Sequence, residues 1–206
     1  GIRLMAYSTI PKGSLYMNSK IYTGNNSSGH GITGVEFQPD WTWIKSTDGT
    51  YNNHTFDSVR GATKSLVTNE NSAQITISGL TAFGTDGFTL GSDAQCNSGG
   101  PFVSWNWLGA NGTSANTDGS ISSTVSANTT SGFSIISYTG NGSLGSSVGH
   151  GLGAVPQMLI TKRLNSADPW IVQQHEITTG NPWDDLYVVL NTDAGRAGTY
   201  SVSGGY

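Results

Sequence analysis

The sequence reads Phe102-Val103-Ser104-Trp105-Asn106-Trp107 in one stretch and Trp41-Thr42-Trp43-Ile44-Lys45 in another. Side chains in both stretches alternate between two faces, which is the two-residue period of a β-strand. Similar short segments recur between turn-forming dipeptides such as Asp48-Gly49 and Asn141-Gly142. They are residues 74–78, 88–90, 121–125, 133–138, 158–162, 170–174 and 186–190. Many short strands predict an antiparallel sandwich or barrel, with a helical turn expected only within residues 56–66.

Composition narrows the classes of protein to consider. The 206 residues include 29 Gly, and only 11% are charged. Gly, Ser, Thr and Asn make up close to half of the chain, which excludes a mostly helical protein. The net charge of −4 argues against a nucleic-acid partner, and the lack of a long apolar run argues against membrane insertion. The lone Cys96 is expected to be a small buried apolar side chain.

An internal repeat divides the chain. The strand segment around Tyr22 is echoed around Tyr138, 116 residues later, and each copy continues with a Gly- and His-rich stretch. A proline and then Lys45 follow in the first copy, and a proline and Lys162 follow 117 residues later in the second. These anchors predict an N-terminal arm (1–19), a first β-sandwich unit (20–108), a connector (109–130) and a second, related but partial β unit (131–206).

Several of these segments together resemble a module of marine and environmental phage structural proteins. They are Tyr22–Asn25, Gly34–Asp40, Trp43–Lys45, Phe56–Lys64, Asp86–Ser92, Val103–Trp107, Asn116–Ser120, Gly132–Ile135 and Val148–Gly153 with Pro156. The resemblance covers roughly residues 20 to 192. It implies a concanavalin A-like, laminin-G-like jelly roll in a tail fibre or another virion surface protein. The expected fold is therefore an all-β, jelly-roll-like antiparallel sandwich followed by the partial second unit.

Glycoside hydrolysis is the enzymatic alternative, because glucanases share the lectin-like jelly roll. Retaining hydrolysis needs two carboxyl groups about 5–5.5 Å apart, which neighbouring positions on one strand face can provide. Glu36, Glu70 and Glu176 each lack an acidic residue two positions later. We therefore expect no enzymatic activity.

Exposed aromatic rings are candidates for sugar contact, since a flat ring stacks on the apolar face of a pyranose. Trp170 and Trp183 flank Asp-Pro and Asn-Pro turns and are expected to be exposed. Trp183 with Asp184 and Asp185 is our candidate recognition loop. The tryptophans of the two alternating stretches are expected to pack in the core, with sugar contact as the alternative; they are Trp41, Trp43, Trp105 and Trp107.

Charged residues supply the remaining candidate sites. Asp57 and Arg60 are spaced for a local ion pair, with ligand contact as the functional alternative. Ca²⁺ takes oxygen ligands, and its weak candidates here are Asp86 and Asp93, together with Asp184 and Asp185. No complete calcium-loop consensus is present, so no cofactor is required by the sequence.

The function expected from these patterns and from the resemblance is structural. The chain is expected to be a building block of a phage virion surface appendage that contributes to adhesion to host-surface glycan. Its partners would be other virion proteins, further copies of itself (a trimer is common in fibres) and the glycan. The alternatives are a polysaccharide-acting glycoside hydrolase of the same fold and a capsid or tail cement protein without a ligand.

Overall fold

The computed structural model describes residues 10, 12–174, 186–193 and 197–198. These residues form strands in several antiparallel sheets, with a 3-10 turn η1 (Gly13–Leu15) and a short helix α1 (Ala94–Asn97) as the helical segments described. Within the same residues, no helix has the length and apolar character needed to span a membrane. The prediction of an all-β protein is confirmed.

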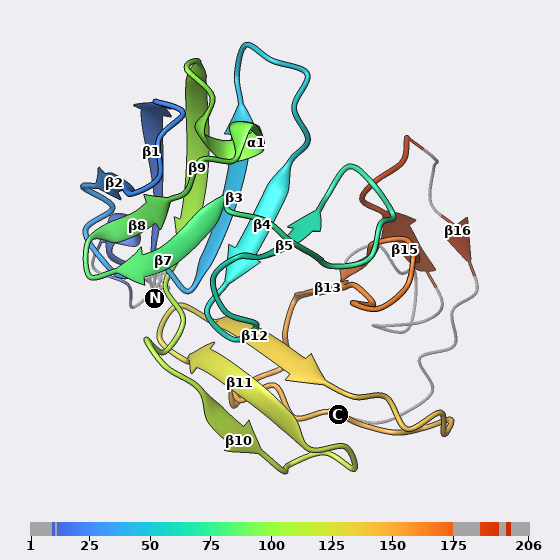
Figure 1. Cartoon of the computed structure of the whole chain (residues 1–206). Helices are drawn as coiled ribbons and strands as arrows, with labels where there is room; N and C mark the ends of the chain where they lie inside the picture. The colour runs from blue at the N-terminus through green and yellow to red at the C-terminus, as the bar shows by residue number, and fades with distance from the viewer. Residues whose placement is uncertain (1–9, 11, 175–185, 194–196, 199–206) are drawn as a thin grey trace, which may run out of the picture.

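Two sheets enclose the main core. One has the strand order β1-β9-β3-β4-β5-β6 and the other has the order β2-β8-β7, with all paired strands antiparallel (Figure 1). The strands are β1 (Met17–Thr23), β2 (His30–Thr33), β3 (Trp41–Ser46), β4 (His54–Asp57), β5 (Lys64–Val67), β6 (Ile75–Thr76), β7 (Leu80–Gly84), β8 (Gly87–Leu90) and β9 (Pro101–Trp107). The resulting core contains Tyr22, Ile32, Ile44, Phe56, Leu80, Phe88, Leu90, Cys96 and Phe102.

Strand alternation explains which residues reach this core. On β3 the side chains of Thr42 and Ile44 are fully buried, whereas those of Trp41 and Trp43 are only partly buried on the opposite face. Cys96 enters the core from α1 and is completely buried, and this burial raises the pKa of its thiol. The expectation that Cys96 is a small buried side chain is therefore confirmed.

Residues 56–66 contain a single helix-type turn, which does not continue as a helix. Asp57 ends β4, and Lys64 begins β5 after a short turn in which Gly61 N donates to Asp57 O. Gly61 has φ +96°, a left-handed conformation that glycine adopts without a steric penalty. The chain reverses here because both flanking strands are fixed in the sheet, and one turn at this length cannot also continue as a helix.

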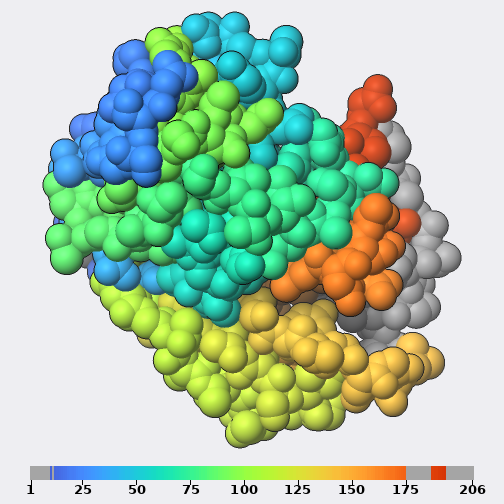
Figure 2. All heavy atoms as spheres, in the orientation of Figure 1, coloured from blue at the N-terminus to red at the C-terminus, as the bar shows by residue number. Residues whose placement is uncertain are grey.

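The remaining strands form two more sheets. One has the order β10-β11-β12 and the other β13-β14-β15-β16 (Figure 1). Their bounds are β10 (Ser114–Asn116), β11 (Ser123–Asn128), β12 (Phe133–Tyr138), β13 (Met158–Thr161), β14 (Ile171–Gln174), β15 (Leu186–Val189) and β16 (Ala197–Gly198). The stretch predicted as a connector, residues 109–130, thus contributes two strands to a sheet. Figure 2 shows the loop after β13 lying against the β5–β6 region, where Gln74 N donates to Leu164 O at 2.7 Å.

Four consecutive strands occur twice with the same pairing register. In β3:β4, Trp41 pairs with Asp57 and Ile44 with His54; 117 residues later, Met158 pairs with Gln174 and Thr161 with Ile171. The later strands follow at a separation of 122 residues. The β4:β5 and β5:β6 pairs His54↔Val67 and Lys64↔Thr76 correspond to Ile171↔Val189 and Leu186↔Gly198. The β3–β6 meander and the β13–β16 meander therefore have one architecture.

The turn that follows the third strand of each meander (after β5 and after β15) is repeated as well. Asn69 Oδ1 accepts a hydrogen bond from Asn53 N at 2.8 Å, and Asn191 Oδ1 accepts one from Trp170 N at 3.0 Å. The lysine of each copy bonds the loop that follows its strand: Lys45 Nζ donates to Gly49 O, and Lys162 Nζ donates to Ser166 O, 117 residues later. These contacts are what an internal repeat predicts, because each depends on the same side chain at the equivalent position.

His54 should make stability depend on pH. It is 2% exposed on the core face of β4, and its Nδ1 lies 2.8 Å from Ser65 Oγ. Burial lowers the pKa of His54 below 6.5, outweighing the opposing influence of Gln95, Asp93 and Glu70. The unfolded chain therefore binds a proton at His54 more readily than the folded chain does. The contribution of neutral His54 to the free energy of unfolding is complete above about pH 6.5. It is lost as the pH falls below this value, by up to ~1.4 kcal/mol per pH unit.

The measurement is urea unfolding at pH 7.5 and pH 5.0 in the wild type and in His54→Gln. The variant is expected to lose less stability between the two pH values than the wild type, because other titrating groups are common to both proteins. Equal losses would contradict this assignment of the pH dependence to His54.

Candidate functional site

Four tryptophans lie on the face of the six-stranded sheet that points away from the core. Trp41 and Trp43 come from β3, and their cross-strand partners on β9 are Trp107 and Trp105. The ring centroids are 4.5 Å apart for Trp41 and Trp107 and 6.1 Å apart for Trp43 and Trp105. All four side chains are partly exposed. The expectation of packing in the main core is wrong, because alternation gives the core face of these strands to Thr42, Ile44, Ser104 and Asn106.

One end of this aromatic row is covered and the other is open. Phe133 at the start of β12 stacks on Trp41 at 6.2 Å and on Trp107 at 6.3 Å. Beside the open end is a hollow of about 370 Å³. Its lining comprises Met17, Trp43, Lys45, Asn53, Trp105 and Trp107. We call this hollow the tryptophan hollow.

A second hollow of about 310 Å³ adjoins the first, and Trp43 and Asn53 line both. Its other lining residues are Thr68, Asn69, Leu190, Asn191, Thr192 and Asp193. They belong to the two equivalent turns that follow β5 and β15, and we call this the amide hollow. Amide, hydroxyl and carboxylate groups therefore lie next to exposed indole rings.

Hydrogen bonds hold the polar residues of both hollows in place. Lys45 Nζ donates to Tyr51 O at 2.7 Å and to Gly49 O at 3.3 Å, which keeps the ammonium group at the rim. Asn69 Nδ2 donates to Asn52 Oδ1 at 2.8 Å, while Asn69 Oδ1 caps Asn53 N. A polar rim that is ordered before binding loses less conformational entropy when a ligand arrives.

Comparison with known protein families assigns the chain to one of them. A family described as a domain of unknown function, DUF7483, matches residues 12–204. The chain belongs to the DUF7483 family. No curated protein and no solved structure matches it. The interpretation of the site in this DUF7483 domain therefore depends on its own geometry.

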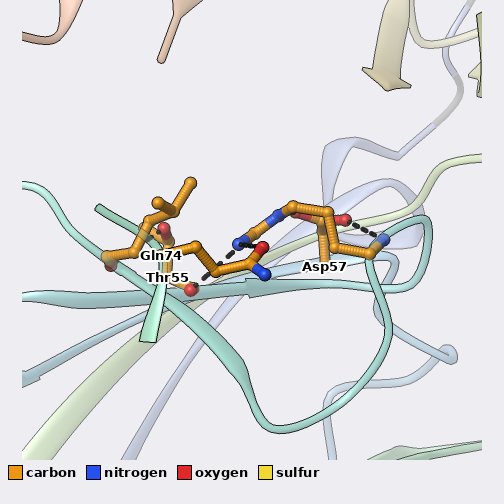
Figure 3. Close-up of polar contacts among 5 residues, drawn as sticks. Thr55, Asp57 and Gln74 are labelled. Atoms are coloured by element: carbon orange, nitrogen blue, oxygen red, sulfur yellow. Dashed lines mark hydrogen bonds and ion pairs between the residues drawn. The ribbon is translucent and has the colours of Figure 1, made fainter. Parts of the chain in front are cut away.

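Asp57 and Arg60 form the expected local ion pair in the DUF7483 domain (Figure 3). Arg60 donates to Asp57 from Nε and from its backbone N, and Arg60 Nη1 donates to Gln74 Oε1 at 3.1 Å. The two side chains are only 8% and 6% exposed. The ion pair is buried, and the bond from Arg60 to Gln74 joins the β4–β5 turn to the loop before β6. It is the local ion pair that the spacing predicted.

Of the two aromatic candidates from the second repeat, Trp170 and Trp183, the structure describes Trp170. Trp170 is 5% exposed, and its Nε1 donates to Val67 O at 2.8 Å. The expectation that Trp170 is exposed is wrong, because this ring packs against β5 of the first meander. The proposed recognition loop of Trp183, Asp184 and Asp185 lies outside the residues that the structure describes.

The carboxylates of the weak calcium candidates Asp86 and Asp93 accept hydrogen bonds from backbone N–H groups. Both carboxylate oxygens of Asp86 accept backbone N–H groups, from Gly34 at 3.0 Å and Glu36 at 2.8 Å, and these bonds lower the pKa of Asp86. Asp93 is the N-cap of α1 and accepts from Gln95 N at 3.0 Å. Neither belongs to a group of three or more acidic, histidine or cysteine side chains within the described residues.

Proposed function

We propose that this chain is a structural module of a phage virion surface appendage that adheres to host-surface glycan through the tryptophan hollow and the amide hollow. One observation carries the glycan part of this proposal. Partly exposed indole rings of Trp43 and Trp105 line one hollow, and side-chain amides line the hollow next to it. Trp43 and Asn53 belong to both, so a single extended ligand can contact both surfaces.

The chemistry of a sugar chain suits this combination. The C–H face of a pyranose stacks on an aromatic ring, and its hydroxyl groups exchange hydrogen bonds with amides and carboxylates. Asn53, Asn191 and Asp193 supply such groups within reach of the same lining. Each hollow is at the small end of the range for ligand sites, which favours weak individual contacts strengthened by several copies acting together.

The lining favours binding over cleavage. Glycoside hydrolysis uses a pair of carboxyl groups placed across the bond to be broken. Among the residues that line the two hollows, Asp193 is the acidic one. We therefore keep a non-enzymatic function as the proposal, and a hydrolase of the same fold remains the alternative that the experiment below can detect.

The proposed architecture is a jelly-roll-like sandwich of the concanavalin A type. Support comes from the single core shared by the six-stranded and three-stranded sheets. A surface poor in charge and rich in hydroxyl and amide groups suits an appendage that is rigid and makes shallow contacts. Oligomerisation with further copies and with other virion proteins would supply the multivalency that weak sites need.

The test is an array of bacterial surface polysaccharides and hexose or N-acetylhexosamine oligosaccharides, followed by titration calorimetry. Trp43→Ala and Trp105→Ala are each expected to weaken binding of an array-positive glycan about tenfold or more, because the stacking surface is lost. Tyr138→Ala is the matched control, since Tyr138 is 47% exposed and lines neither hollow.

Three results would contradict the proposal. A silent array would favour the cement-protein alternative. If Tyr138→Ala weakened glycan binding as much as the tryptophan variants do, the binding site would lie outside the two hollows. Release of reducing ends that a single glutamate substitution abolishes would make the protein a hydrolase.

A further inference from the structure

The tryptophan hollow carries one positive charge. Its lining combines three indole rings with Met17, Asn53 and Lys45, and Lys45 is the cation among these residues. Lys45 follows Trp43 on β3 at an alternate position, so both side chains lie on the face that points away from the core. A lysine stem packs along apolar surface while its ammonium group stays at the boundary with water. An ammonium group therefore stands beside a surface suited to stacking on sugar rings.

This ammonium group is held in place but is not neutralised. Lys45 Nζ has three N–H donors, and two of them donate to Tyr51 O and Gly49 O. Within the described residues, the ion pairs involve other cations. Asp48 follows on the same loop, but its Oδ1 accepts from Ser46 Oγ, and Ser46 lies on the buried face of β3. The third N–H of Lys45 is therefore left for an acceptor that a ligand brings.

The second repeat has the same lysine with a carboxylate beside it. Lys162 lies 117 residues after Lys45 and also donates to a carbonyl oxygen of the loop that follows its strand. At the same separation, Asp168 stands where the first repeat has Tyr51. Burial lowers the pKa of Lys162, and the negative charge of Asp168 opposes this shift, so the carboxylate acts on the ammonium group. The first repeat keeps the carbonyl cradle and lacks this acid.

The amide hollow has the opposite charge. Asp193 is the acidic residue among those that line it, and none of these lining residues is a cation. A ligand carboxylate placed there would be repelled, whereas hydroxyl and N-acetyl groups can bond to the amides. Trp43 and Asn53 line both hollows, so one extended ligand can reach both. The two charges therefore fix which part of such a ligand lies in which hollow.

We propose that the glycan bound here is acidic: the carboxylate of a hexuronic acid or another acidic sugar binds Lys45 in the tryptophan hollow, and a neutral neighbouring sugar lies in the amide hollow. This inference rests on the proposed glycan-binding function and adds the class of the ligand. The ring of the acidic sugar would stack on Trp43 or Trp105, and its carboxylate would accept the remaining N–H of Lys45. A hydrogen bond between charged groups is roughly twice as strong as a neutral one, so the carboxylate would decide the choice of glycan.

The probe is a panel of oligosaccharides in which hexuronate or sialate residues alternate with neutral sugars. Each is paired with its carboxyl-reduced form, in which a primary alcohol replaces the carboxylate while the rings and linkages stay the same. Calorimetry with the whole 206-residue protein in 50 mM NaCl is expected to show the acidic form of at least one pair binding about tenfold more tightly. This difference should shrink in 500 mM NaCl, because salt screens the attraction.

Three variants assign the preference to Lys45. Lys45→Met should bind the acidic form no better than the reduced form and should leave the affinity for the reduced form unchanged. Tyr51→Asp places the acid of the second repeat beside Lys45 and should also remove the preference, which keeps the test decisive if Lys45→Met fails to fold by circular dichroism. Lys162→Met is the matched control and should keep the preference, because Lys162 lines neither hollow.

The outcomes separate this inference from the function on which it rests. Equal binding of both forms, a preference that survives in Lys45→Met and Tyr51→Asp, or its loss in Lys162→Met would overturn the acidic class. If the reduced forms bind equally well and depend on Trp43, the glycan-binding function stands and this inference fails. A panel silent in both forms would also overturn the inference, and silence of the wider glycan array would overturn the function as well.

Discussion

Replacing Arg60 by alanine is expected to lower the free energy of unfolding by about 3–5 kcal/mol, because a buried carboxylate loses its charged partner. Asp57 is 5% exposed, and its carboxylate would retain only the backbone N–H of residue 60 as a donor. Gln74 would lose the guanidinium that ties the loop before β6 to the β4–β5 turn. The measurement is urea unfolding followed by tryptophan fluorescence.

Lys12→Ala provides the comparison. Lys12 and Glu36 also form an ion pair, with Nζ and Oε2 2.9 Å apart, but their side chains are 59% and 48% exposed. Water solvates both charges when an exposed pair is broken, so the loss should stay within about 1 kcal/mol. If Arg60→Ala costs no more than Lys12→Ala, the Asp57–Arg60 pair does not hold the turn as described.

Replacing Asn97 by alanine is expected to cost about 3 kcal/mol. Its side chain is fully buried and joins α1 to the Gly-rich link between β1 and β2. Asn97 Oδ1 accepts from Asn25 N at 2.9 Å, and Asn97 Nδ2 donates to Gly91 O at 2.7 Å and to Ser27 O at 2.9 Å. Alanine would leave the buried Gly91 O without its donor and would also remove the bonds that fix the exposed residues Asn25 and Ser27.

Asn141→Ala is the control for this second prediction. Asn141 is the counterpart in the second repeat of Asn25, a partner of Asn97, and its Oδ1 accepts from Ser143 N and Ser146 Oγ in an exposed turn. Water can replace those bonds, so a loss of about 0.5 kcal/mol is expected, as for an ordinary surface change. Thermal unfolding measures the loss of stability in both variants. Equal losses in Asn97→Ala and Asn141→Ala would contradict the account.

Strand positions were largely predictable from alternation. The segment 133–138 forms β12 over the predicted residues, and the tryptophan-rich stretches form β3 and β9. Alternation fixes which residues share a face, because successive side chains of a strand point to opposite sides. It does not fix which face is buried. The face of Thr42 and Ile44 is buried because the β2-β8-β7 sheet packs there, and that packing depends on contacts distant in sequence.

Other elements had no clear local signal. The stretch beginning at His30 looks like a Gly-rich turn, yet it forms β2 because β8 pairs with it from His30↔Leu90 to Thr33↔Gly87. The turn between β4 and β5 depends on Arg60 reaching Gln74, a contact between loops. The Asp168-Pro169 turn beside Trp170 suggested that this ring is exposed, but the ring is buried and its Nε1 donates a long-range hydrogen bond to Val67 O.

The candidate site was the hardest feature to find from sequence. The amide hollow joins Asn53 and Asn69 to residues 190–193, which are brought together only by the packing of two meanders. One signal was present: Val67-Thr68-Asn69 and Val189-Leu190-Asn191 follow the same pattern at the ends of equivalent strands. Extending the repeat to these positions would have placed both asparagines in equivalent turns after a strand, although not next to each other.

The most direct test of the account is ¹⁹F NMR of protein labelled with 5-fluorotryptophan, titrated with an array-positive glycan. Single substitutions of the six tryptophans assign their resonances. The account predicts shifts for Trp43 and Trp105, whose rings line the tryptophan hollow, and none for the buried Trp170. Shifts confined to Trp183, with Trp43 and Trp105 unchanged, would contradict it and return the binding site to the loop first suggested by the sequence.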